Sequence, residues 1–308
     1  MDTAVSISGL TRHFRGVRAV DGLTFDVLPG ELFGVVGPDG AGKTTTLRML
    51  AGVLAPTTGD ALVHGISVAR DPEGVKRHIA YMSQRFGLYT DLTVRENIDF
   101  YADLFLVPRA ARPQRLERLY RFSGLGPFEN RLAGQLSGGM KQKLGLSCAL
   151  VHEPDIMLLD EPTFGVDPIS RRDLWLIVHE MVARGVTVIA ATAYLDEAER
   201  CDRVALLHEG RLIALDTPQA LQQPLTGHIQ RVRTDDARHT REVLRRQPTV
   251  QHAVLFGDAV HATVQDPARD WPRALAALEA AGVLILEEGP AEPSLEDAFI
   301  QLVGGHGD

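Results

Sequence analysis

The stretch Gly37-Pro38-Asp39-Gly40-Ala41-Gly42-Lys43-Thr44 decides the fold of this chain. It fits the pattern G-x-x-x-x-G-K-[ST], in which the backbone N–H groups of a glycine-rich loop surround phosphate oxygens. The apolar run at residues 31–36 predicts a buried strand before the loop, and residues 45–51 predict the start of a helix after it. Strand, loop and helix in this order are the setting that the pattern requires.

The chemistry of this loop favours a phosphate chain as its ligand. N–H groups at a helix N-terminus, together with the helix dipole, attract an anion. Glycines let the main chain come close to phosphate oxygens. Lys43 can reach the β- and γ-phosphates, the Thr44 hydroxyl can ligate Mg²⁺, and Thr45 is expected to add a further phosphate contact.

Two other predicted strands end in polar side chains. Residues 79–82 are followed by Gln84, and the apolar run at 155–161 ends in Asp160 and Glu161. Ligands of open α/β sheets bind at the carboxyl ends of strands, so we expect these side chains near the loop. Asp160 suits Mg²⁺, directly or through a water, and Glu161 suits a general base or a water-positioning group. Gln84 can ligate Mg²⁺ or orient a water.

A second glycine-rich helix start lies at residues 136–142, with the sequence LSGGMKQ. It is another candidate phosphate site, formed by Ser137, Gly138 and Gly139. Before it, a capping box at residues 93–96 opens a helix that runs to 105, and a second helix is expected over 113–122. We therefore predict that about residues 86–136 form a helical insert on an α/β core.

Length and composition limit the classes of protein to which this chain can belong. The chain has 308 residues, of which 44% are hydrophobic, and a formal net charge of −8. These values predict a folded protein of two domains and argue against one that mainly coats nucleic acid. The two cysteines, Cys148 and Cys201, lack metal or redox spacing and are expected in the core.

Membrane signals are missing from the sequence pattern. Residues 1–4 lack the basic and apolar segments of a secretion signal. No apolar run reaches the roughly 18 residues that span a bilayer, and the run at 185–191 is strand-sized. We expect that a protein of this kind serves a membrane only through a partner.

The pattern changes near Pro224, where we place a domain boundary. Residues 1–223 predict the α/β domain with its helical subdomain. Residues 224–308 alternate as β-α-β-β-α-β and end in a further helix, which predicts a small α+β domain of the ferredoxin-like type.

Taken in order, these motifs resemble the nucleotide-binding domain of ATP-binding-cassette (ABC) transporters over residues 1 to about 220. Gln84 matches the Q-loop, residues 136–142 match the LSGGxxQ signature, residues 155–161 match the second Walker motif, and residues 165–167 match the D-loop. Phe14, in a predicted loop at residues 12–17, matches the adenine-stacking aromatic of that family. The resemblance implies an α/β P-loop NTPase cassette with a helical subdomain.

Further stretches are similar to the multidrug-exporter branch of that family, which pairs with ABC-2-type permeases. They are residues 37–45, 85–94, 125–128 and 165–172, and residues 294–300 are similar to the end of the C-terminal domain found in the same branch. The likeness is greatest to the N-terminal cassette of double-cassette efflux ATPases. The resemblance thus covers nearly the whole chain.

The resemblance implies the ligands, the site and the partners. The ligands are ATP and Mg²⁺, with Glu161 and Gln84 as catalytic residues and Thr44, Gln84 and Asp160 as metal ligands. The chain would hydrolyse ATP on the cytoplasmic inner face of the membrane, for a permease that exports drugs or other small molecules. In a head-to-tail dimer with a like or unlike cassette, each ATP would lie between one phosphate loop and the partner cassette's residues 137–139.

Two residues depart from the family pattern. Ala193 stands where T-H-x-x-D-E-A would have its histidine, and Phe164 replaces the small residue before the D-loop glycine. Losing one preorganised donor typically costs about 10²–10³ in rate, so we expect ATP binding with slow hydrolysis. The alternative function is a degenerate cassette that serves as the regulatory or structural half of an asymmetric pair. A member acting on ribosomes or DNA is disfavoured by the negative charge.

Overall fold

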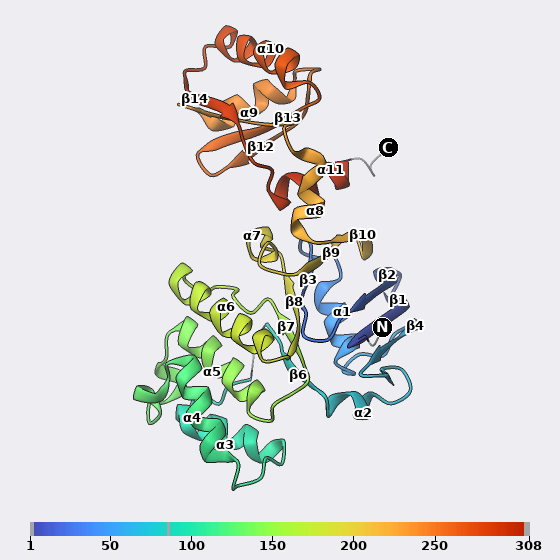
Figure 1. Ribbon diagram of the computed structural model, residues 1–308, viewed down its shortest axis with the longest axis vertical. Coiled ribbons are helices and arrows are strands. Elements are labelled where there is room, and N and C mark those ends of the chain that lie inside the picture. Colours follow the sequence, from blue (N-terminus) through green and yellow to red (C-terminus); the bar gives the residue numbers. More distant parts are fainter. Residues whose placement is uncertain (1–2, 85–86, 305–308) are drawn as a thin grey trace. The chain divides into compact units, whose positions relative to one another are not determined.

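The computed structural model describes residues 3–84 and 87–304. The chain divides into two compact units, Met1–Leu212 and Ile213–Asp308, shown in Figure 1. The short helix α8 (Pro218–Gln222), which the sequence analysis placed in the first domain, groups with the second unit, as does η3 (Gln223–Leu225), which spans the predicted boundary. Residues 85 and 86, within the predicted start of the helical insert, lie outside the described residues.

A largely parallel sheet forms the centre of the first unit, with the strand order β10-β9-β3-β8-β7-β6. Its strands are β3 (Leu32–Val36), β6 (Ile79–Met82), β7 (Ile156–Asp160), β8 (Thr187–Thr192), β9 (Arg203–His208) and β10 (Arg211–Asp216). Every residue of β3, β7 and β8 is buried, which explains their unbroken apolar sequences. Because β6, β7, β8, β3 and β9 run parallel, their carboxyl ends meet at one edge.

Helices pack against this sheet. They are α1 (Lys43–Leu50), α6 (Pro168–Ala183) and the short α7 (Leu195–Ala198) (Figure 1). Helix α6 buries the apolar stripe Leu174, Ile177, Val178 and Met181, as its spacing predicts. The helix begins at Asp167, whose carboxylate accepts a hydrogen bond from the Ser170 N–H at 2.9 Å.

A second sheet of the first unit is antiparallel and has the order β2-β1-β4-β5. It comprises β1 (Val5–Phe14), β2 (Val17–Val27), β4 (Thr58–Val63) and β5 (Ile66–Ser67), and α2 (Pro72–Lys76) follows. The prediction of a loop at residues 12–17 was wrong. Arg15 and Gly16 take positive φ values of 38° and 90° and form a two-residue hairpin turn, so Phe14 ends β1 opposite Val17.

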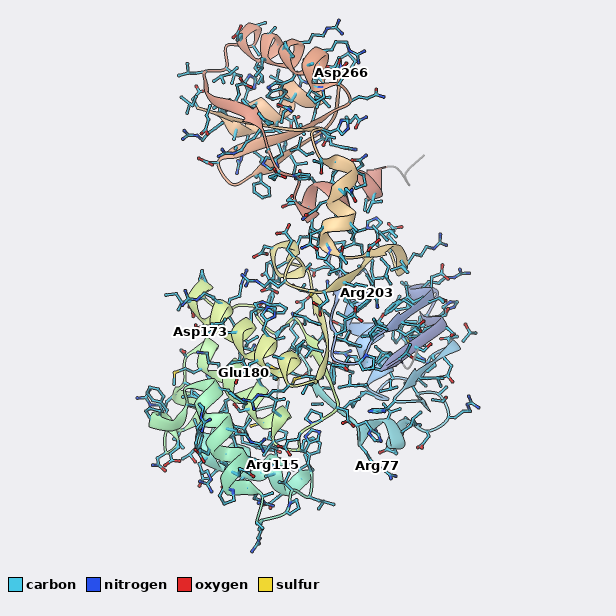
Figure 2. The ribbon with its side chains drawn as sticks, viewed as in Figure 1. Arg77, Arg115, Asp173, Glu180, Arg203 and Asp266 are labelled. Atoms are coloured by element: carbon cyan, nitrogen blue, oxygen red, sulfur yellow. The ribbon has the colours of Figure 1, made fainter. Side chains whose placement is uncertain are left out.

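Ion pairing joins the two sheets. The Arg203 side chain lies on β9 (Figure 2), and its Nε donates to the buried Glu31 carboxylate at 2.6 Å. Its Nη2 also donates to the Asp26 carbonyl oxygen at the end of β2, at 2.8 Å. One guanidinium group therefore fixes the antiparallel sheet to the start of β3, the strand that leads into the glycine-rich loop.

The helical part of the first unit contains α3 (Val94–Leu104), α4 (Arg112–Ser123), α5 (Gly138–Leu150) and the short turns η1 (Gly126–Phe128) and η2 (Ala133–Gln135). The predicted capping box is present, because Thr93 and Glu96 exchange hydrogen bonds at the start of α3. Its core joins all three helices and includes Ile98, Leu116, Leu144 and the buried Cys148. No helix within residues 3–84 and 87–304 is long and apolar enough to cross a bilayer.

The second unit carries an antiparallel sheet of order β12-β13-β11-β14. In chain order its elements are β11 (Ile229–Thr234), α9 (Ala237–Arg245), β12 (Val250–Phe256), β13 (Ala259–Val264), α10 (Pro267–Ala280) and β14 (Ile285–Pro290), followed by α11 (Leu295–Gly304). This is the β-α-β-β-α-β order that the sequence pattern indicates. A core around Val232, Leu244, Trp271 and Leu278 packs both helices on one face of the sheet.

A carboxylate fixes the last helix of this unit. Asp297 Oδ2 accepts hydrogen bonds from the Ser294 N–H at 2.9 Å and the Ser294 hydroxyl at 2.7 Å, and lies 3.2 Å from His261 Nδ1. Burial alone would raise the pKa of Asp297, but these contacts with His261 and Ser294 outweigh it and lower the pKa.

We predict that Asp297→Ala lowers the free energy of unfolding at neutral pH by about 1–2 kcal/mol, because Ser294, which precedes α11, loses the carboxylate that accepts its hydrogen bonds at the start of the helix. A lowered pKa in the folded state gives stability that is present above about pH 4 and lost as the pH falls through the folded-state pKa. The difference between wild type and variant should therefore shrink in acid. Calorimetric melting of the full chain measures it, with exposed Glu292→Ala as the charge-matched control. An equal loss in both variants would contradict the prediction.

Candidate functional site

The glycine-rich loop lies between β3 and α1, as the sequence predicts, and two glycines there cannot be replaced. A Cβ atom on Gly37 would lie 2.2 Å from the Leu207 carbonyl oxygen, and one on Gly42 would lie 2.4 Å from that of Ala19. Gly42 also caps α1 with a φ of 99°. Residues 43–45 at the N-terminus of α1 line a cavity together with the loop, which leaves the N–H groups there accessible to an anion.

The loop folds around the side chain of Lys43, which is only 4% exposed. Its Nζ donates to the carbonyl oxygens of Gly37 at 2.8 Å and Pro38 at 3.1 Å. The same atom lies 3.4 Å from Glu161 Oε1. A buried ammonium group must be paired, and here loop carbonyls and one carboxylate supply the partners. An incoming phosphate would compete with Glu161 for this charge.

Thr44 and Asp160, the two predicted metal ligands, are in direct contact. The Thr44 hydroxyl donates to Asp160 Oδ1 at 2.8 Å, and the Tyr81 hydroxyl donates to Asp160 Oδ2 at 3.1 Å. Burial, followed by the charge of Asp160, raises the pKa of Tyr81 to about 12, so this donor keeps its proton at neutral pH. Tyr81 orients the buried carboxylate, a role that the sequence analysis did not assign.

Gln84 and Glu161 form a second pair at the same edge of the sheet. Gln84 Nε2 donates to Glu161 Oε2 at 2.8 Å. Glu161 directly follows β7 with a positive φ of 49°, and its N–H donates to the Ala191 carbonyl oxygen at 2.9 Å. The Glu161 carboxylate therefore lies between Gln84 and Lys43. Contacts with these two side chains and the strained backbone of Glu161 fix its position.

A cavity of about 720 Å³ opens over the loop, and its lining defines the candidate site. The lining contains residues 39–45 together with Val17, Arg18, Ala19, Gln84, Glu161 and Glu209. Most of the predicted site residues are thus brought together. Phe14 is not in this lining, although its strand partner Val17 is. The Phe14 ring is covered on one face by the Arg12 guanidinium, 4.7 Å from the ring centroid.

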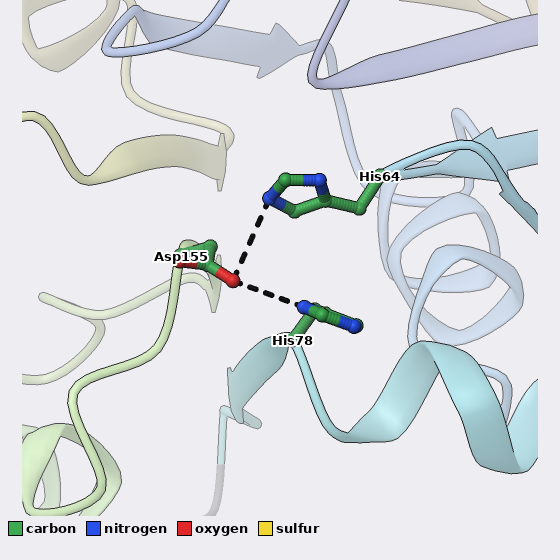
Figure 3. Close-up of side chains that lie close together, drawn as sticks. All are labelled: His64, His78 and Asp155. Atoms are coloured by element: carbon green, nitrogen blue, oxygen red, sulfur yellow. Dashed lines mark hydrogen bonds and ion pairs between the residues drawn. The ribbon is translucent and has the colours of Figure 1, made fainter.

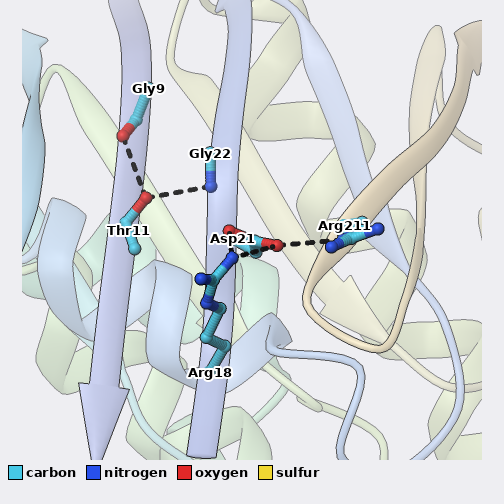
Figure 4. Close-up of polar contacts among 6 residues, drawn as sticks. All are labelled: Gly9, Thr11, Arg18, Asp21, Gly22 and Arg211. Carbon is cyan, nitrogen blue, oxygen red and sulfur yellow. Dashed lines mark hydrogen bonds and ion pairs between the residues drawn. The ribbon is translucent and has the colours of Figure 1, made fainter.

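Arg18 and Glu209 were missed because their hairpins carry no motif. Asp21 holds Arg18 in place, with Arg18 Nη1 3.1 Å from Asp21 Oδ1 and Arg211 Nε 2.9 Å from Asp21 Oδ2 (Figure 4). The hydrogen bond from Arg211 is the main cause that lowers the pKa of Asp21, and Arg18 adds to it. The Thr11 hydroxyl, which accepts from the Gly22 N–H at 3.0 Å, ties the same strand to β1.

Ser137, Gly138 and Gly139 lie at the start of α5 and are not in the lining of the cavity over the loop. Ser137 caps the helix, because its hydroxyl accepts from the Met140 N–H at 3.3 Å. Gly139 packs on the start of α6, where an added Cβ would lie 2.2 Å from Ser170 Oγ and 2.3 Å from Ser170 Cβ. The second glycine-rich helix start is therefore not part of the cavity over this chain's own phosphate loop.

Ala193 follows β8 beside the loop. The Gly37 N–H donates to the Thr192 carbonyl oxygen at 3.4 Å, which brings the end of β8 next to the phosphate loop. The fully buried Glu197 accepts hydrogen bonds from the hydroxyls of Thr163 and Thr192. Arg171 of α6 lies 3.4 Å from the same carboxylate. Glu197 thus connects three segments around position 193, and only the structure reveals this.

Comparisons with known proteins agree with this geometry. The ABC transporter family matches residues 20–164. The chain is 37% identical over 310 residues to the daunorubicin/doxorubicin resistance ATP-binding protein DrrA of Streptomyces peucetius, covering 99% of this chain and 94% of that protein. It is 34% identical over 305 residues to the Nod factor export ATP-binding protein I of Paraburkholderia xenovorans, covering 98% of each.

A stronger match covers only part of its relative. The chain is 44% identical over 311 residues to the probable multidrug ABC transporter ATP-binding protein YbhF of Escherichia coli, and spans 99% of itself but 53% of that protein. This chain therefore corresponds to about half the length of that relative.

Solved structures share the fold. An ATP-binding subunit of an ABC transporter matches with a TM-score of 0.66 and 31% identity, over 73% of this chain and 94% of that one. A dimeric ATP-binding cassette, MJ0796, matches with a TM-score of 0.64 and 23% identity, over 69% and 98%. The chain belongs to the ATP-binding proteins of ABC transporters, whose cassettes bind ATP.

We predict that Gly139→Ala destabilises the first unit by about 1–3 kcal/mol, because the new methyl group overlaps Ser170. Gly138→Ala is the matched control, since its Cβ would meet nothing closer than the Gly165 carbonyl oxygen at 3.8 Å. Adding Ser170→Gly to Gly139→Ala should restore most of the stability, as urea denaturation would measure. Equal losses for both glycines, or no rescue, would contradict this packing.

Proposed function

We propose that this chain binds Mg-ATP in the cavity over the phosphate loop and couples ATP binding and hydrolysis to an ABC-2-type permease that exports drugs or other small molecules. The observation that carries the proposal is the convergence of Lys43, the Thr44–Asp160 pair and the Gln84–Glu161 pair at one sheet edge. In this proposal residues 37–45 hold the triphosphate, and the adenine ring lies near Phe14 and the hairpin turn after it.

The donor set fits Mg²⁺, a hard cation that prefers oxygen ligands. Thr44 Oγ1 and Asp160 would hold it, with the Gln84 amide oxygen as a third candidate ligand. Bound there, the cation would neutralise charge that develops on the phosphates. Tyr81 fixes the orientation of Asp160, and Glu161 orients or deprotonates the attacking water once a phosphate has replaced it as the partner of Lys43.

A head-to-tail pair of cassettes gives the second glycine-rich helix start a use. Residues 137–139 do not line their own chain's cavity, and in this proposal they complete the nucleotide site of a second cassette. The exposed Phe164, at 56%, would lie at the seam of that pair. The partner cassette is a like or an unlike chain, and the assembly would work on the cytoplasmic face of the membrane.

Slow hydrolysis is part of the proposal. Position 193 lies beside the loop and Glu161, yet alanine offers no side-chain donor there. A missing transition-state donor lowers the rate without weakening the contacts that hold ATP. The same observation favours the second candidate function, a poorly hydrolysing cassette that acts as the regulatory half of an asymmetric pair.

We predict that Ala193→His raises steady-state Mg-ATP hydrolysis by about tenfold or more, because it restores one preorganised donor. Ala193→Leu adds bulk without a donor and should not raise the rate. Lys43→Ala should abolish ATP binding, whereas Glu161→Gln should abolish turnover and retain binding. If wild type is already fast and Ala193→His adds nothing, the histidine is dispensable and the slow-hydrolysis proposal fails.

The permease contact is expected on the helical part. Its surface exposes Phe100 by 37% and Leu104 by 59%, both on α3, and the Tyr89 ring packs on Phe100 at 4.6 Å between centroids. Neighbouring exposed apolar side chains of this kind mark an interaction surface.

We predict that the double variant Phe100→Ser/Leu104→Ser loses most of its co-purification with a polytopic membrane protein, because the apolar contact is removed. ATP binding should persist, since neither residue lines the cavity over the loop. Leu176→Ser on α6, where leucine is 60% exposed, is the control. Unchanged recovery of the membrane partner with the double variant would overturn this assignment of the contact.

A further inference from the structure

Two imidazoles and one carboxylate converge at the sheet edge opposite the candidate nucleotide site. His64 Nε2 lies 3.5 Å from Asp155 Oδ2, and His78 Nδ1 lies 3.0 Å from the same oxygen. The donor atoms of all three residues lie within 4.8 Å of one another. Figure 3 shows both rings directed at the one carboxylate oxygen. We propose that His64, His78 and Asp155 form a binding site for a divalent transition-metal cation, with Zn²⁺ as its best ligand.

The backbone places these residues with little freedom. The His78 carbonyl oxygen accepts hydrogen bonds from the N–H groups of Asp155 and Ile156, both at 3.1 Å. The Asp155 carbonyl oxygen in turn accepts from the Thr187 N–H at 3.1 Å. His64 sits in the tight turn between β4 and β5 with a positive φ of 53°, and its N–H donates to the Ala4 carbonyl oxygen at 2.9 Å. The three side chains thus project from fixed points, as a metal site requires.

The spacing suits tetrahedral zinc. Ligands at about 2.0–2.1 Å from a tetrahedral ion lie roughly 3.4 Å from one another. The two measured separations from Asp155, 3.0 and 3.5 Å, are already close to this value. The ring centroids of His64 and His78 are 5.0 Å apart and their donor nitrogens lie within 4.8 Å of each other, so in this proposal side-chain rotation brings the two nitrogens to the spacing of a bound ion. Zinc would replace the contacts that the imidazoles now make with the carboxylate.

The donor types decide which cation binds. Imidazole nitrogen suits zinc and its transition-metal neighbours, whereas Mg²⁺ prefers a shell of oxygen ligands and waters. This site therefore disfavours Mg²⁺, the cation that accompanies ATP. A cavity of about 630 Å³, lined in part by His64, Gly65 and Asp155, leaves room for a water or another ligand in the fourth position.

The site's position gives it a mechanical role. His78 directly precedes β6 and Asp155 directly precedes β7, while Gln84 and Asp160–Glu161 lie at the other ends of these strands. Strands of this length put the two edges roughly 15–20 Å apart. A bound cation would cross-link the β4–β5 hairpin to the parallel sheet and stabilise the first unit without touching the nucleotide site.

The experiment is a calorimetric titration of Zn²⁺ into the nucleotide-free, Mg²⁺-free full chain at about pH 7.5. We expect one tight equivalent per chain and a rise in melting temperature. His64→Ala, His78→Ala and Asp155→Asn should each weaken this binding by about tenfold or more. His239→Ala, which removes an exposed histidine of the second unit, should leave it unchanged.

Two outcomes would overturn the proposal. One is Zn²⁺ binding that His64→Ala and His239→Ala weaken equally, because such binding is adventitious. The other is the absence of a saturable equivalent in wild type. Mg-ATP binding by His64→Ala tests the nucleotide site separately, and its retention shows that loss of zinc reflects the His64 site alone. X-ray absorption of the zinc-loaded chain should show two imidazole ligands in wild type and one in His64→Ala.

Discussion

A buried positive charge is the constraint on which the rest of the structure depends. The Lys43 ammonium group lies inside the turn between β3 and α1, bonded to two loop carbonyls and close to Glu161. An ammonium group cannot be taken out of water without partners, so the loop must close around it and β7 must end beside it. The same arrangement leaves the N-terminus of α1 accessible, and it places the Lys43 ammonium group where a phosphate can pair with it.

The parallel sheet brings the other residues of the candidate nucleotide site next to the phosphate loop. Because β6, β7, β8 and β3 run in one direction, the residues at their carboxyl ends reach one edge. These are the polar Gln84 and Asp160–Glu161, together with Ala193 and the loop itself. Buried contacts then fix their relations, with Tyr81 on Asp160 and Glu197 between Thr163 and Thr192. The alanine at 193 offers no side-chain donor at this edge, and the proposal of slow hydrolysis rests on that missing donor.

The opposite edge of the same strands is also ordered by polar groups. The His64–Asp155–His78 cluster lies where β6 and β7 begin. Backbone hydrogen bonds fix the positions of its three residues. The two edges are joined through the short strands β6 and β7, of which β7 is fully buried. In the proposal made above, a cation at one edge would change the stability of the sheet that carries the other site, without any direct contact between the two.

The sequence by itself determined the phosphate loop, the strand ends with Gln84, Asp160 and Glu161, the helical insert, the family and the order of elements in the second unit. These features are local, because a motif and its flanking strand and helix need only neighbouring residues to be recognised. Only the tertiary structure decided that residues 12–17 are a hairpin, that Arg18, Glu209 and Tyr81 belong to the site, and that residues 137–139 do not line the cavity over the loop. It also brought His64 and His78 to Asp155. Those facts depend on contacts between distant segments, which packing and backbone hydrogen bonds set and which sequence spacing does not encode.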